Sequence, residues 1–219
     1  MFNKYRCIRN GFEKGNFTRR QLIEVLPFFD GIVVKEVSGE DILDVLEIGV
    51  AKLPSAHARF LQVSGISFDV NTNIESPCLF DGSGNFINIT NGERRVSNVK
   101  INNVYLDVNK KYKTSLRLYM ADGGDGYEIL SKYEVAQEAL FSESDILGIY
   151  IRDDLKGVIP DKYGATEGRI NVYSKTINTD ENSEENKNSN NDSDSSNSQN
   201  SNIVRVSISL LVLIIYFIN

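Results

Sequence analysis

Histidine and cysteine are scarce in this chain. Among its 219 residues, His57 is the one histidine, and Cys7 and Cys78 are the two cysteines. A classical zinc site takes three or four ligands, drawn mostly from these two residue types. The composition therefore argues against a His- or Cys-ligated metal site within this chain.

A surplus of basic residues is also missing. Lys and Arg number 24 against 30 for Asp and Glu, which gives a formal net charge of -6 and a pI near 5.0. A general nucleic-acid-binding protein needs a basic face to neutralise phosphates. We therefore expect no nucleic-acid partner.

Apolar residues are plentiful by comparison. Hydrophobic residues make up 41% of the chain and aromatic residues 10%, which is enough to build a core and excludes disorder of the whole chain. The length suggests one domain or two small ones.

The composition changes abruptly near the C-terminus. Asp180–Asn202 contains 8 Asn, 7 Ser and 6 acidic residues, and it offers no apolar side chain for burial, so we expect it to be disordered. Ile203–Asn219 is mostly Ile, Val and Leu, with Arg205 as its one charge. The sequence thus divides into a folded domain over 1–176, a polar linker over 177–202 and a hydrophobic tail over 203–219.

Three interpretations of this tail remain open. A transmembrane helix needs about 20 apolar residues, whereas the tail is 17 residues long and includes Arg205 and three polar residues. A buried core helix is a second possibility. The third is a glycosylphosphatidylinositol (GPI) anchor signal, which consists of small residues, a polar spacer of about 8–12 residues and a terminal hydrophobic stretch of about 10–20. We favour the anchor signal, with Ser193, Asp194 and Ser195 as candidate attachment residues, and therefore a location at the cell surface.

The N-terminal residues do not show the signal peptide that a cell-surface protein requires. An anchor signal works only in the secretory pathway, yet residues 1–32 contain no apolar stretch of the length that a signal peptide requires. We therefore expect the chain to be the C-terminal part of a longer precursor.

The middle of the chain predicts a mixture of helices and strands. Ser38 opens a pattern typical of a helix N-terminal capping box, and the glycines of Gly123–Gly126 predict a turn with positive φ or a close backbone approach. A second N-cap is predicted at Ser142. Helices are predicted over 19–26, from 39 to a stop at Pro54 and over 141–154; strands over 31–37, 60–70, 96–106, 112–120 and 169–173; and a long loop over 71–93.

Three phrases of this region together resemble one family. They are QLIEVLPFFDGIVVKEVSGEDILDVLEIGV from Gln21, RFLQVSGI from Arg59 and YMADGGDGY from Tyr119; TEGRI from Thr166 adds to them. In this order and spacing they are similar to the C-terminal domain of the 5'-nucleotidases, a family that includes ecto-5'-nucleotidase and the periplasmic UDP-sugar hydrolases. The resemblance runs from about Arg6 to Tyr173.

The resemblance implies a fold, an activity and partners. The fold would be α+β, with layers in the order α/β/β/α. The activity of the complete enzyme would be hydrolysis of nucleoside monophosphates such as AMP to nucleoside and phosphate. The catalysis would belong to an N-terminal metallophosphoesterase domain, absent from this chain, that holds two zinc-like divalent metal ions. A homodimer formed through this domain is also implied.

The resemblance also implies residues that contact substrate. Phe60 and Tyr119 match two aromatic residues that hold the base between them, and two aromatic faces suit a flat, polarisable purine. Asp125 matches a residue that accepts hydrogen bonds from both ribose hydroxyls. Arg6 matches an arginine that holds phosphate, although the residues before it depart from the family's pattern. A core Phe, an Asp that bonds within its own turn and a solvated Arg are the structural alternatives.

Other features have several interpretations. Cys7 and Cys78 could form a disulfide with each other, or either could pair outside this chain. Three glycosylation sequons begin at Asn16, Asn88 and Asn191 and support secretion weakly. We expect His57 to be a surface or loop residue.

Two functions follow from the sequence. The first is the nucleotide-binding domain of a surface 5'-nucleotidase. The second is a non-catalytic surface protein that binds nucleotide or a partner through this domain.

Overall fold

The computed structural model describes most of the first 174 residues of the chain. The described residues are 2–4, 8–11, 15–160 and 167–174. The expected linker over 177–202 and the hydrophobic tail over 203–219 therefore lie outside the described residues.

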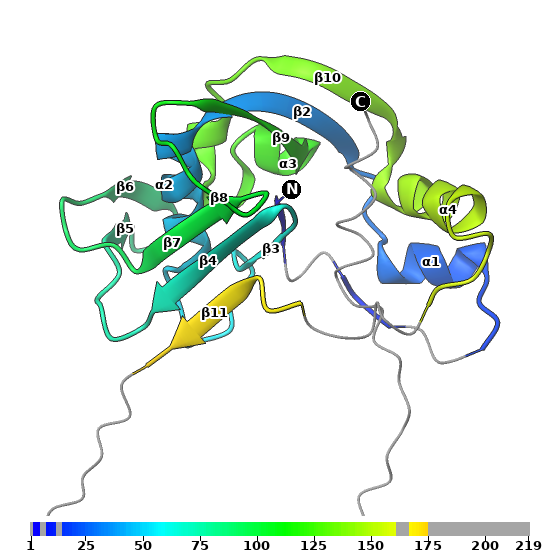
Figure 1. The fold of residues 1–219 in the computed structure, drawn as a ribbon, viewed down its shortest axis with the longest axis horizontal. Coiled ribbons are helices and arrows are strands. Elements are labelled where there is room, and N and C mark those ends of the chain that lie inside the picture. The colour runs from blue at the N-terminus through cyan, green and yellow to red at the C-terminus, as the bar shows by residue number, and fades with distance from the viewer. Residues whose placement is uncertain (1, 5–7, 12–14, 161–166, 175–219) are drawn as a thin grey trace, which may run out of the picture.

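The larger sheet has five strands in the order β10-β2-β9-β1-β3. Its centre is the antiparallel pairing of β2 with β9, while β1 runs parallel to β9. These strands are β1 (Phe2–Lys4), β2 (Gly31–Ser38), β3 (Leu61–Val63), β9 (Lys111–Arg117) and β10 (Val135–Ser142). In Figure 1 the strands β10 and β2 arch over the top of the molecule.

A second sheet has four strands in the order β11-β4-β7-β8. Its strands are β4 (Ile66–Asn71), β7 (Val96–Ile101), β8 (Val104–Tyr105) and β11 (Ile170–Tyr173), and β11 runs parallel to β4. A separate hairpin is formed by β5 (Cys78–Phe80) and β6 (Phe86–Ile89). Figure 1 shows this hairpin at the end of the molecule opposite to the helices α1 and α4.

Two hydrophobic clusters hold these elements together. The main cluster includes residues of both sheets and of α2 (Gly39–Val50), a helix that contacts β2, β3 and β7. The second cluster joins α1 (Arg19–Val25) to α4 (Glu143–Asp153), which lie side by side in Figure 1. The α+β fold class predicted from the sequence is confirmed.

The predicted helix starts are confirmed in detail. The Ser38 side chain accepts a hydrogen bond from the Asp41 backbone N–H, and Ser142 does the same for Asp145. The reciprocal half of the box at Ser38 differs, because the Ser38 backbone N–H donates to the Tyr133 hydroxyl. Tyr133 thus takes the role that the Asp41 carboxylate would have in a complete capping box.

Several element predictions were wrong. The predicted loop over 71–93 contains the β5–β6 hairpin, and β10 was not predicted. The predicted strand over 112–120 ends at Arg117, and the chain then forms the short helix α3 (Leu118–Ala121). The predicted strand over 60–70 is two strands, β3 and β4, and Phe60 lies just before the first. The predicted strand over 96–106 is likewise split into β7 and β8.

Candidate nucleotide-contacting site

The glycine-rich segment after α3 has the backbone that the sequence predicts. Gly123 and Gly126 have φ values of 97° and 90°, and Asp125 between them has a φ of 60°. Residues 124–126 form a short 3-10 turn, η2. A non-glycine residue in the left-handed region is uncommon, and Asp is among the residues that tolerate it best.

The Tyr119 ring lies against this turn. A Cβ added to Gly124 would come within 2.3–2.6 Å of three atoms of that ring, so only glycine permits the approach. The Tyr119 hydroxyl also donates to Oδ1 of Asp125 across 3.3 Å. Tyr119 remains 52% exposed. Two residues that the sequence predicts to contact nucleotide are therefore in contact with each other, at the surface.

Phe60 is linked to the same turn through its neighbour. The Arg59 side chain donates from Nε to the Asp125 carbonyl oxygen across 2.6 Å, and from Nη2 to the Gly84 carbonyl oxygen. The Tyr127 hydroxyl in turn donates to the Arg59 carbonyl oxygen at 2.6 Å. Phe60 itself is half-buried and packs against the main hydrophobic cluster. A half-buried Phe60 is compatible with a role in the core and with contact between its exposed part and a ligand.

A buried lysine forms hydrogen bonds to both ends of the segment that runs from α3 to η3 (Glu128–Leu130). Lys35 on β2 is 2% exposed, and its Nζ donates to the carbonyl oxygens of Ala121 and Leu130 at 2.7 and 3.1 Å. Burial lowers the pKa of Lys35, and the nearby charge of Asp122 opposes that shift. The two ends of the segment that includes Asp125 are thus fixed to one strand of the central sheet.

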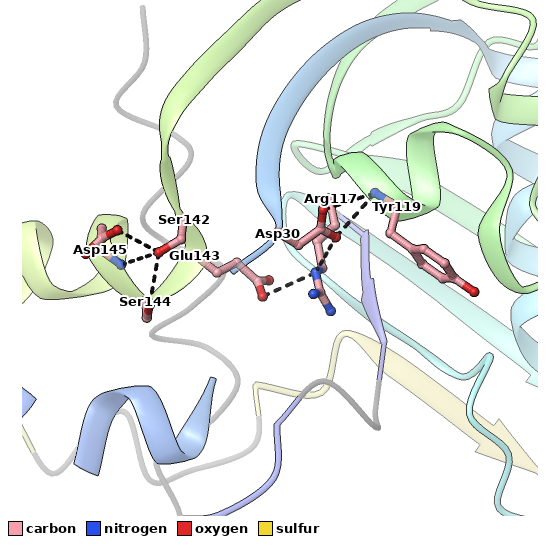
Figure 2. A network of polar contacts seen from close by, with 7 residues as sticks. All are labelled: Asp30, Arg117, Tyr119, Ser142, Glu143, Ser144 and Asp145. Atoms are coloured by element: carbon pink, nitrogen blue, oxygen red, sulfur yellow. Dashed lines mark hydrogen bonds and ion pairs between the residues drawn. The ribbon is translucent and has the colours of Figure 1, made fainter. Parts of the chain in front are cut away.

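An ion-pair network adjoins the backbone of Tyr119 (Figure 2). The Asp30 carboxylate accepts from the Tyr119 backbone N–H at 3.2–3.3 Å and pairs with Arg117 Nε at 3.1 Å. The same Arg117 nitrogen lies 3.3 Å from Oε2 of Glu143. Sequence reasoning missed these three residues. The signal was weak, because each is a single charge beside or within a predicted strand or helix.

The remaining candidate residues are less informative. Arg6, Ser193, Asp194 and Ser195 lie outside the described residues. The His57 ring nitrogen Nδ1 accepts from the Arg59 backbone N–H at 3.3 Å, in the loop before β3.

Cys78 is a buried free thiol in this structure, so the alternative of a disulfide at this residue gains no support. Its partner in one version of that alternative, Cys7, lies outside the described residues. Burial raises the pKa of the Cys78 thiol to about 11.

A groove of about 650 Å³ lies elsewhere, between α1 and α4. It is lined by Gly15–Phe17 and by residues of the two helices, among them Arg19, Asp145 and Arg152. Arg19 pairs with Asp145, and Arg152 pairs with Asp153, so these guanidinium groups are engaged with carboxylates. Neither Tyr119 nor Asp125 lines this groove, and we place the candidate site at the turn because polar and aromatic groups converge there.

The described residues contain neither a metal-binding cluster nor a membrane-spanning helix. Within that part of the chain, no group of three or more His, Cys, Asp or Glu side chains is arranged to hold a metal ion. The helices of that part are also too short or too polar to span a membrane.

Comparison with known proteins assigns the family. The model of the family described as "5'-nucleotidase, C-terminal domain" matches residues 2–132. This chain belongs to that family. The phrases that suggested the resemblance begin at Gln21, Arg59 and Tyr119, and all three lie inside the matched region.

Individual relatives cover the family domain but extend well beyond it. The chain is 31% identical over 162 residues to a 5'-nucleotidase of Diplobatis ommata, which covers 74% of this chain and 26% of that protein. It is 26% identical over 144 residues to a 5'-nucleotidase of Vibrio parahaemolyticus, covering 66% of this chain and 22% of that protein. The chain thus spans about a quarter of the length of these two curated relatives.

A solved structure agrees in fold. The crystal structure of a 5'-nucleotidase precursor from Thermus thermophilus superposes with a TM-score of 0.59 and 29% sequence identity, covering 76% of this chain and 30% of that one. The structure of the Haemophilus influenzae NAD nucleotidase shares the fold with a TM-score of 0.53 at 19% identity, covering 74% of this chain and 27% of that one.

Proposed function

We propose that this chain is the substrate-binding domain of a 5'-nucleotidase that hydrolyses nucleoside monophosphates such as AMP to nucleoside and phosphate. The water-activating chemistry belongs to a metallophosphoesterase domain outside this chain, which holds the divalent metal ions. Family membership and two relatives named 5'-nucleotidase support this assignment.

The observation that carries the proposal is the contact between Tyr119 and Asp125. An exposed aromatic ring offers a face to a base, and stacking of this kind tolerates different bases because each has a π-face. A carboxylate beside it has two oxygens that match the two hydroxyls of a ribose. The pair therefore combines groups complementary to the two halves of a nucleoside. In this structure Oδ1 of Asp125 accepts the Tyr119 hydroxyl and Oδ2 is buried, so ribose binding requires the Asp125 side chain to reorient.

Phe60 would supply the second aromatic face. Its half-buried position fits a ring that rests on the core and shows one side to ligand, and Arg59 keeps its segment beside the Asp125 turn. Arg6 would hold the phosphate through its planar guanidinium.

The proposal is tested by AMP binding to the chain and to three variants. Tyr119→Ala and Phe60→Ala should each weaken AMP binding by about 1–3 kcal/mol, the typical worth of one stacked base. Asp125→Ala should weaken binding of AMP more than that of 2'-deoxy-AMP, because the deoxy sugar has already lost one hydroxyl donor. Calorimetric titration gives the affinities.

Melting temperatures of the same variants separate binding from folding. A Phe60→Ala protein that melts far lower but binds AMP normally would remove Phe60 from the site, since truncation of a core Phe costs about 3–5 kcal/mol of stability. Unchanged AMP affinity in all three variants would contradict the proposed function.

The cell-surface location is part of the same proposal. Residues 203–219 would direct attachment of a lipid anchor near Ser193, Asp194 or Ser195, with a single membrane span as the alternative. A phosphatidylinositol-specific phospholipase should then release the surface protein from cells. Surface protein that resists this enzyme would favour a membrane span instead.

A further inference from the structure

Tyr119 is held on two sides. Its ring rests against Gly124 and its hydroxyl meets Asp125, whereas its backbone N–H points to the Asp30 carboxylate. Figure 2 shows the ring directed away from the ion-pair network to which the backbone is bonded. The direction of the ring therefore depends on how the start of α3 is fixed.

That start lacks the usual local cap. Arg117 occupies the N-cap position of α3 and makes no side-chain hydrogen bond there. The first N–H groups of a helix have no partner within it and need one from elsewhere. Asp30, which lies 89 positions before Tyr119 in the sequence, supplies that partner through both carboxylate oxygens.

Arg117 keeps the Asp30 carboxylate in place. Its side chain is 7% exposed and lies between two carboxylates, those of Asp30 and Glu143, whose side chains are 14% and 3% exposed. Removal of one member of a buried ion pair leaves the other charge uncompensated, which is strongly unfavourable. The three side chains therefore constrain one another.

The network also spans the two hydrophobic clusters. Asp30 lies on the segment that leads from α1 to β2, Glu143 is the first residue of α4, and Arg117 ends β9 in the central sheet. The α1–α4 cluster is thus tied to the strand from which α3 and Tyr119 emerge.

We propose that Asp30 and Arg117 are positioning residues for nucleotide binding, which act by fixing the backbone of Tyr119 so that its ring faces the base. This inference rests on the proposed function, in which Tyr119 stacks on the nucleotide. Neither residue is required to touch the ligand.

A double-mutant cycle on AMP affinity tests the inference in the full chain. Asp30→Ala should weaken AMP binding about tenfold, a part of the worth of one aromatic–base stack. In a Tyr119→Ala background the same Asp30→Ala change should have no further effect, since the side chain that it positions is gone. Equal losses in both backgrounds would overturn the inference, because a general structural role adds independently of Tyr119.

Two further variants guard against loss of folding. Asp30→Asn keeps an oxygen that accepts the Tyr119 N–H, so it should bind AMP more tightly than Asp30→Ala. Asp44→Ala is the matched control, because Asp44 forms an ion pair with Arg94 at 2.6 Å on other elements; it should leave AMP affinity unchanged. An Asp30→Asn protein that melts like wild type yet binds no better than Asp30→Ala would also overturn the inference.

The cycle separates this inference from the proposal beneath it. If Tyr119→Ala weakens AMP binding and Asp30→Ala does not, only the positioning role fails. If Tyr119→Ala itself leaves AMP affinity unchanged, the stacking site is wrong and the positioning role falls with it.

Discussion

At the scale of single residues, the close approach of Tyr119 to Gly124 explains why the turn after α3 needs its second glycine. Gly123 and Gly126 have a positive φ, which favours glycine, whereas a side chain at Gly124 would clash with the Tyr119 ring. The glycine-rich segment therefore turns the chain and also leaves room for the Tyr119 ring to lie against the backbone of Gly124.

Gly124→Ala should displace the Tyr119 ring. The new Cβ would lie 2.3 Å from a ring atom, so the ring must move and its stack on a base should be lost, which weakens AMP binding by about 1–3 kcal/mol. Gly82→Ala is the control, since its Cβ would meet nothing within 4 Å. AMP affinity equal in the two variants would show that Tyr119 does not stack on the base in the proposed way.

Tyr119→Phe isolates the hydroxyl from the ring. The ring should still stack, so the loss of AMP affinity should be smaller than in Tyr119→Ala. It should not be zero, because the hydroxyl bonds to Asp125, and a hydrogen bond typically contributes about 0.5–1.5 kcal/mol. Calorimetric titration of AMP into both variants measures the difference; a loss in Tyr119→Phe as large as in Tyr119→Ala would assign the effect to the hydroxyl.

At the scale of elements, the segment between α3 and η3 depends on the buried Lys35. Lys35→Met should fill the same space but remove the Lys35 donor from the Ala121 carbonyl oxygen, at a cost of about 1–3 kcal/mol for a buried group left unsatisfied. The Leu130 carbonyl oxygen would keep the Tyr133 backbone N–H at 3.3 Å. Chemical denaturation measures the loss. Lys113→Met, an exposed position on β9, is the control, and equal stability of the two variants would contradict the role of Lys35.

The helix α2 contains a buried carboxyl group whose ionisation should affect stability. Glu47 is fully buried, its Oε1 accepts the Val96 N–H at 2.8 Å, and burial raises its pKa against the opposing effects of that bond and of Arg94 and Arg95. The unfolded chain loses this proton first as the pH rises. The stabilisation from this group is therefore complete below the ordinary value of 4.5 and is lost as the pH rises through the folded pKa.

Glu47→Gln should remove that dependence. The amide oxygen can still accept the Val96 N–H, but the side chain no longer ionises, so the stability of the variant relative to wild type should rise as the pH is raised from 4.5 through the folded pKa of Glu47. Denaturant titrations at several pH values give the slope of this difference. A difference that stays flat or falls over that range would contradict the raised pKa of Glu47.

Elements with local signals were predicted well from the sequence. Ser38 and Ser142 cap the helices that their sequence context predicts, and Pro27 follows the end of α1. The strand β10 escaped prediction because its apolar residues do not alternate with polar ones, as they would in a strand with one buried face, and because it lies at the edge of its sheet. The hairpin β5–β6 was hidden by its short strands and by the polar turn from Asp81 to Asn85.

Within the candidate site, the contact between residues close in sequence could be predicted, and the contacts between distant residues could not. Tyr119 and Asp125 belong to one continuous phrase, so the resemblance brings them together directly. Asp30, Arg117 and Glu143 come from three distant parts of the chain, and their meeting follows from the pairing of β2 with β9 and β10. No local pattern indicates such a contact.

At the scale of the whole molecule, binding and catalysis should separate. The chain contains a single histidine and covers about a quarter of its curated relatives. The full 219-residue chain should therefore bind AMP but release no phosphate from it when zinc is added, since water activation needs a complete ligand set for the metal. A phosphate-release assay checks this, with a complete 5'-nucleotidase as positive control. Metal-dependent turnover of AMP by this chain would contradict the assignment of catalysis to a domain outside it.

The most direct test of the central claim uses the absence of tryptophan from the chain. Tyr119→Trp would place a unique tryptophan at the proposed stacking position, and Tyr105→Trp would place one at an exposed position on β8 as a control. Stacking of a base on the indole should quench the fluorescence of the first variant in a saturable AMP titration and leave that of the second unchanged. Quenching that is absent at position 119, or equal at both positions, would contradict nucleotide binding through Tyr119.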